Sequence, residues 1–139
     1  EYLEQIADKL PKSLYSAYMR TNGFHDYAVK RVTVNGDAWC YWKKSDVVML
    51  EVRFEKTEYS ITFNGITYLK LLNEFQNTCW HGEVGSYNSS LKQGLEEIVL
   101  CELGVVSEGE YSFEFFTSSG AIFEVRFQQV KVAKRKIYY

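Results

Sequence analysis

The chain has 139 residues, of which 46% are hydrophobic and 24% are charged, and its formal net charge is −2. This length suits one domain with its own core, so we expect residues 1–139 to fold as a single unit that needs neither a disulfide nor a metal. The acidic balance argues against a nucleic-acid-binding protein, which usually carries a basic surface. We interpret the basic residues near the C-terminus as a solvated strand end rather than a phosphate-binding patch: Lys131, Lys134, Arg135 and Lys136.

The cysteines and the hydropathy of the chain indicate a compartment. Cys40, Cys79 and Cys101 are odd in number and lack CxxC spacing, so they do not form a typical disulfide framework, and a reducing cytoplasm fits best. No apolar run approaches the roughly 18 residues that a membrane span needs, and no secretory leader is evident. We therefore expect a cytoplasmic protein without a membrane partner.

The first 22 residues predict a helical segment. Leu3, Ile6, Leu10 and Leu14 recur at three- and four-residue steps, which is typical of an amphipathic helix. Pro11 should kink this segment or begin a second short helix. The Asn22-Gly23 pair should end it, since Gly readily adopts the left-handed conformation of a helix cap.

Residues 25–71 predict a first β-meander, because apolar and polar residues alternate there with a period of two. Val29 is out of phase with its neighbours, which indicates a bulge. Asn35-Gly36 and Asn64-Gly65 predict tight turns between strands. The expected strands span residues 25–34, 38–42, 47–54, 59–63 and 66–71.

Residues 72–94 lose this alternation, and residues 95–133 resume it. We expect an irregular segment, favourable for function, followed by strands at 95–103, 110–116 and 121–132. The predicted fold is α+β: an N-terminal helix or helices packed on a twisted, mostly antiparallel meander sheet of about seven or eight strands that could curl around the helix.

Two small clusters could carry chemistry. His25-Asp26 has side chains suited to proton transfer or metal binding, but adjacent residues of an extended strand point to opposite faces, so we interpret it as a polar pair at the entry of a strand or as a helix-end cap. In Cys79-Trp80-His81 the thiol and the imidazole would share a face, as a nucleophile and its base require. This triplet matches no known cysteine-enzyme motif, so we interpret Trp80 as an aromatic anchor instead.

The ligand spacing expected of a zinc site is missing from His25, Asp26, Cys79 and His81. The glutamates are many, but no spacing singles out a catalytic pair, so we place them on the solvated face of the sheet. Phosphate-binding, metalloprotease and serine-hydrolase motifs are also missing. The sequence therefore predicts no catalytic residue, metal or cofactor.

One resemblance rests on the order of the strand patterns. A His25-Asp26 pair opens the first strand, the alternating run 59–66 ends in Asn64-Gly65-Ile66, and an acidic strand at 98–103 precedes a final hairpin that includes 123–127. This pattern over residues 24–132 resembles small β-rich bacterial proteins of Gram-positive type, some of them proposed immunity partners of toxins. The resemblance implies a protein partner, a toxin among the possibilities, and assigns no catalytic residue.

Two functions follow as expectations. The first is a non-enzymatic protein-interaction module, with binding residues Trp80, His81, Tyr87, Cys79 and His25, because tyrosine and tryptophan anchors supply much of the energy of such contacts. The alternative is a small-molecule binding domain or enzyme with a pocket between the helices and the aromatic sheet. Exposed sheet edges could also support a homodimer by strand pairing.

Overall fold

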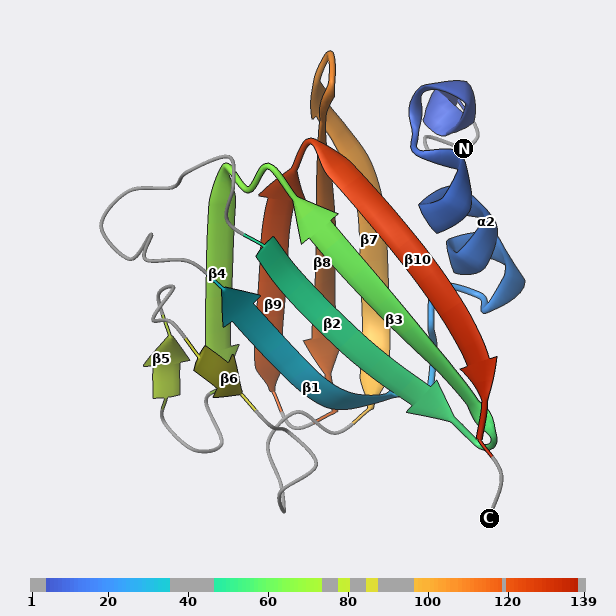
Figure 1. Ribbon diagram of the computed structural model, residues 1–139, viewed down its shortest axis with the longest axis vertical. Helices are drawn as coiled ribbons and strands as arrows, with labels where there is room; N and C mark the ends of the chain where they lie inside the picture. The colour runs from blue at the N-terminus through green and yellow to red at the C-terminus, as the bar shows by residue number, and fades with distance from the viewer. Residues whose placement is uncertain are drawn as a thin grey trace.

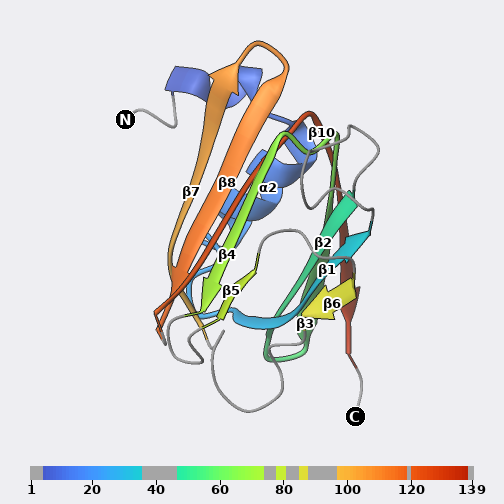
Figure 2. The same ribbon diagram turned by 90° about the vertical axis from the view of Figure 1, so that its left-hand side faces the viewer.

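Two facing β-sheets make up most of the molecule (Figures 1 and 2). The computed structural model describes residues 5–35, 47–73, 78–80, 85–87, 97–118 and 120–137. Sheet A consists, from edge to edge, of β10 (Gln129–Lys136), β3 (Thr57–Asn64), β2 (Val47–Phe54), β1 (Ala28–Asn35) and β6 (Gly85–Tyr87). Sheet B consists of β5 (Thr78–Trp80), β4 (Tyr68–Asn73), β9 (Ala121–Phe127), β8 (Glu110–Thr117) and β7 (Ile98–Ser107). Every strand pairing within these ranges is antiparallel.

The antiparallel α+β class is confirmed, but the prediction of a single meander of seven or eight strands is wrong. The described ranges contain ten strands in two sheets. In chain order these strands change sheet between β3 and β4, on either side of β6, and between β9 and β10. Asn64-Gly65 is not a tight hairpin turn, because β3 and β4 lie in different sheets; the backbone bends there at Gly65, whose φ is +66°. The expected strand 121–132 is likewise two strands. Such bends form the corners at which strands pass from one packed sheet to the other.

Hydrogen bonds hold the two bends side by side. The Gln128 N–H donates to the Asn64 carbonyl at 3.0 Å, and the Thr67 N–H donates to the Arg126 carbonyl at 2.9 Å. A second corner joins β1 to β7 through an antiparallel bridge between Ala28 and Glu97. The two sheets are therefore connected at both corners rather than being separate layers.

The N-terminal residues form a 3-10 turn, η1 (Ala7–Lys9), and a short helix, α2 (Lys12–Arg20). Pro11 occupies the N-cap of α2, which confirms that it begins a second helix. Asn22 and Gly23 have φ values of +55° and +70°, which confirms the left-handed end of that helix. The helix lies beside β10 of sheet A (Figure 1). No helix in the described ranges is long and apolar enough to cross a bilayer.

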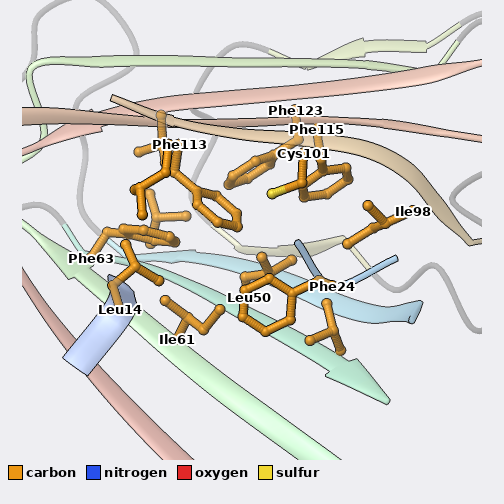
Figure 3. Close-up of a cluster of buried hydrophobic side chains, with 14 of the residues drawn as sticks. Leu14, Phe24, Leu50, Ile61, Phe63, Ile98, Cys101, Phe113, Phe115 and Phe123 are labelled. Carbon is orange, nitrogen blue, oxygen red and sulfur yellow. The ribbon is translucent and has the colours of Figure 1, made fainter. Parts of the chain in front are cut away.

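The core lies between the sheets and beneath α2 (Figure 3). Phe63 of sheet A meets Phe113 of sheet B with their ring centroids 5.5 Å apart. Leu14 from the helix and Phe24 from the turn after it are fully buried in the same cluster. Burying each such side chain contributes roughly 1.5–3 kcal/mol, so the helix is held by the core that it helps to cover.

Four local predictions have mixed outcomes. The expected strand 25–34 starts late, at Ala28, because residues 21–26 form a turn. The bulge near Val29 is confirmed by a register shift between Val29 and Arg31. The expected strand 38–42 lies outside the described residues. The irregular segment 72–94 is corrected in part, since β4 continues through Asn73 and the segment contains the short strands β5 and β6.

Candidate functional site

The turn that links α2 to β1 adopts an unusual backbone conformation. Asn22, Gly23, Phe24 and Asp26 all have positive φ, a region that costs a bulky residue such as phenylalanine on the order of 1–2 kcal/mol. Phe24 compensates by burying its ring completely against Tyr59 and Phe113. Packing of Phe24 in the core therefore stabilises the conformation of this turn.

Hydrogen bonds from both sides complete this turn. The Phe24 N–H donates to Thr21 Oγ1 at 2.9 Å, and Thr21 Oγ1 donates to the Ala17 carbonyl at 2.8 Å. The Asp26 N–H donates to the carbonyl of Ile98 on β7 at 2.9 Å. These bonds tie the end of the helix to the edge of sheet B and fix the space between them.

That space is a surface groove of about 270 Å³, which we call the α2–β7 groove. Its walls include Tyr18, Met19, Asn22 and His25 on one side and Val99 and Leu100 on the other. Met19, Val99 and Leu100 are each about half exposed, at 51%, 50% and 50%. Clustered exposed apolar side chains of this kind are typical of binding surfaces.

A β-bulge places two neighbouring apolar residues at this groove. The pairing of β7 with β8 shifts register between Ile98 and Leu100, so Val99 and Leu100 are both exposed although strand neighbours normally point to opposite faces. Leu100 lies opposite Phe116, which lies opposite Ile122 of β9. Phe116 is 36% exposed, so the apolar surface continues from the groove onto the outer face of sheet B.

Tyr18 and Cys101, two groups at the groove that can carry a proton, are poorly suited to proton transfer. The Tyr18 hydroxyl donates to the Cys101 carbonyl at 2.6 Å, and burial, followed by the nearby Cys101 and Glu102, raises the pKa of Tyr18 to about 12. Burial also raises the pKa of the Cys101 thiol well above its usual range, which keeps it protonated and unreactive. Neither Tyr18 nor Cys101 therefore offers a reactive group to the groove.

His25 is the predicted site residue that lies at this groove. The prediction that His25 and Asp26 point apart assumed an extended strand, whereas both lie in the turn. His25 Nδ1 is 3.3 Å from Asp26 Oδ1, and the two side chains are 50% and 59% exposed. They form an exposed polar pair just before β1, which agrees with the interpretation as a strand-entry pair, but their side chains touch.

Three of the other predicted site residues belong to strands at other edges of the sheets. Cys79 and Trp80 belong to β5, at the edge of sheet B opposite β7, and Tyr87 belongs to β6, an edge of sheet A. His81 lies outside the described residues. Among the residues that are described, no three His, Cys, Asp or Glu side chains gather as a metal site would need.

Sequence reasoning missed Met19, Val99 and Leu100. A faint signal exists in the four-residue apolar run 98–101, which breaks the alternation of the acidic strand. The run cannot reveal which of its members face solvent, because that depends on the position of the bulge. Met19 joins them only through the packing of α2.

No known protein-family profile matches the chain, and no curated protein matches it significantly.

Proposed function

We propose that this protein is a non-enzymatic interaction module that buries the α2–β7 groove against a partner protein. The observation that carries the proposal is the half exposure of Met19, Val99 and Leu100 at one groove. A rigid site supports it further, because the core and the backbone bonds hold the turn and β7 in place. A site that is already formed binds without the cost of ordering.

The finer proposal is that the partner is a toxin that this protein neutralises. Its support is the resemblance of the strand pattern to β-rich bacterial proteins of which some are proposed immunity partners. The hypothesis that Trp80, His81, Cys79 and Tyr87 anchor the partner stays a prediction, as does a homodimer through sheet edges.

Replacing Leu100 by serine tests the proposal. Leu100→Ser should reduce capture of the partner from native cell extract by at least tenfold, because removing a central apolar anchor from an interface commonly costs more than about 1–2 kcal/mol. Thermal stability should hardly change, because the side chain is already 50% exposed. Captured proteins are quantified by mass spectrometry.

Val106→Ser is the matched control, since Val106 lies on the same strand, is 42% exposed and is not part of the groove. The control should capture as much partner as the unchanged protein does. Equal capture by Leu100→Ser and Val106→Ser would contradict a role for the groove. A toxin domain among the proteins lost with Leu100→Ser would support the immunity role.

A small-molecule site is the second candidate. The groove volume of about 270 Å³ is close to the lower end of ligand pockets, roughly 300–1,000 Å³, and Asn22 and His25 supply polar groups at its wall. Farther inside, the space between α2 and the sheets is occupied by Leu14, Phe24 and Phe63. A metabolite that raises the melting temperature of the unchanged protein but not of Met19→Ser would favour this candidate.

A further inference from the structure

Three glutamates form a row across the outer face of sheet B. In the strand register Glu102 of β7 lies opposite Glu114 of β8, and Glu114 lies opposite Glu124 of β9. Like charges directly opposite in an antiparallel sheet destabilise it, so this row is unfavourable in the isolated protein. Burial, then Glu124 and Glu102, raise the pKa of Glu114, and Lys70 and Arg126 offset this only in part, as expected of a carboxylate in such a row.

Glu124, at the end of the row far from the groove, has cationic neighbours, whereas Glu102, at the end near the groove, has no ion-pair partner among the described residues. Glu124 lies opposite Lys70, and its Oε2 is 3.5 Å from Arg126 Nη2. In the described part of the chain neither Glu102 nor Glu114 forms an ion pair. Negative charge therefore remains beside β7, the strand that forms one wall of the groove.

The carboxylates run next to the apolar surface of the site. Leu100 precedes Glu102 by two positions, and Phe116 follows Glu114 by two, so on each strand the acidic and apolar side chains share one face about 7 Å apart. A partner that covers Leu100 and Phe116 must therefore approach Glu102 and Glu114. Desolvating these carboxylates without a cation would be costly.

We infer that the partner is a basic protein surface, whose apolar side chains contact the α2–β7 groove and Phe116 while its Lys or Arg side chains pair with Glu102 and Glu114. The inference rests on the proposed function, because it adds the partner's charge to the same surface. Opposite charge is what makes two surfaces complementary and what speeds their encounter. Nucleic acids and anionic membranes would be repelled.

A second copy of this chain is a weaker occupant. A cluster of its basic residues lies on β10, at the edge of sheet A, with Lys131, Lys134 and Arg135 exposed. A contact between β10 of one copy and the outer face of sheet B of another uses two different surfaces. Such contacts extend into open chains unless the rotation happens to close a ring.

A random 12-residue peptide library displayed on phage tests the inference when it is selected on the unchanged protein. Selected peptides should combine apolar residues with a net positive charge. Their affinity should fall at least fivefold for the double variant E102Q/E114Q, and it should weaken as NaCl rises from 50 to 300 mM. The control E55Q/E108Q removes two exposed glutamates elsewhere and should bind the same peptides unchanged.

The remaining outcomes separate the two proposals. Neutral or acidic peptides that lose affinity for Leu100→Ser would overturn the basic partner while supporting the groove as a binding site. Peptides that bind Leu100→Ser as well as the unchanged protein, or the absence of any enrichment, would overturn both proposals. Concentration-dependent assembly of the unchanged protein that E102Q/E114Q abolishes would make a second copy the occupant and would also overturn the inference.

Discussion

Individual residues in this protein accept unfavourable conformations or charges where the groove and its surroundings are built. Phe24 has a φ of +56° and is fully buried, so packing stabilises a conformation that its side chain disfavours. Glu114 is in an unfavourable electrostatic position, because it lies opposite Glu102 and Glu124 on neighbouring strands. Strain at functional positions is commonly offset by the stability of the rest of a fold.

Glu114→Gln should therefore raise the melting temperature at pH 7. Burial and the nearby Glu124 and Glu102 raise the pKa of Glu114 from 4.5, while Lys70 and Arg126 oppose the shift only in part. A carboxyl group whose pKa is higher in the folded protein than in the unfolded chain destabilises the fold once it is ionised. This destabilisation is fully present above the raised pKa and is lost as the pH falls below 4.5.

Thermal melts of Glu114→Gln and the unchanged protein between pH 3.5 and 7.5 check this prediction. The advantage of the variant should grow as the pH rises from 4.5 through the raised pKa of Glu114. Glu108→Gln, at an exposed turn, serves as the control and should show little advantage at any pH. A lower melting temperature of Glu114→Gln at pH 7 would show that the carboxylate stabilises the sheet.

The helix α2 is too short to be stable by itself and depends on its contacts with the core. It has nine residues, and isolated helices shorter than about 12–15 residues are marginal in water. Its buried residues are Leu14 and Ala17, which pack on the core, while the Tyr18 hydroxyl bonds to β7. The groove exists only while this helix is docked, because Tyr18 and Met19 of the helix form part of its wall.

Leu14→Ala should lower the free energy of unfolding by about 2–5 kcal/mol, since it removes a fully buried side chain and leaves a cavity. Urea unfolding followed by tryptophan fluorescence measures the change. Ser13→Ala, which alters the exposed neighbour on the same helix, should change the stability by less than about 0.5 kcal/mol. Equal effects of the two substitutions would mean that α2 does not stabilise the core.

At the scale of the whole molecule, the sheets share one core and should unfold together. Phe63 of β3 contacts Phe113 of β8 and Phe127 of β9, with ring centroids 5.5 and 4.7 Å apart. At two corners the chain runs directly from one sheet into the other, from β3 into β4 and from β9 into β10. A perturbation of one sheet is therefore expected to reach the other.

A double-mutant cycle on Phe63→Leu and Phe113→Leu tests this coupling. Because aromatic pairs in contact contribute about 0.5–1.5 kcal/mol beyond their buried area, the two losses of unfolding free energy should be non-additive by a similar amount. Phe63→Leu combined with Val106→Ser, an exposed position, should be additive. Additivity in both cycles would mean that the sheets are energetically independent.

The local features of this fold were predictable from the sequence. Alternation located strands at 47–54, 59–63 and 110–116, and Pro11, Asn22-Gly23 and the phase of Val29 correctly indicated a helix start, a helix end and a bulge. Each of these depends on residues close together in the chain. The sequence likewise indicated that His25 and Asp26 form a polar pair at the entry of a strand.

Tertiary structure decided how the strands are divided and which residues meet. Alternation of apolar and polar residues is the same whether strands lie in one sheet or two, so the pattern of 121–132 could not reveal the passage between sheets at Gln128. Met19 and Leu100 line one groove because α2 docks on the core with Tyr18 bonded to β7, and the row of Glu102, Glu114 and Glu124 depends on strand register and bulge positions. Sequence spacing determines the conformation of each segment, whereas the packing of distant segments on one core determines the site.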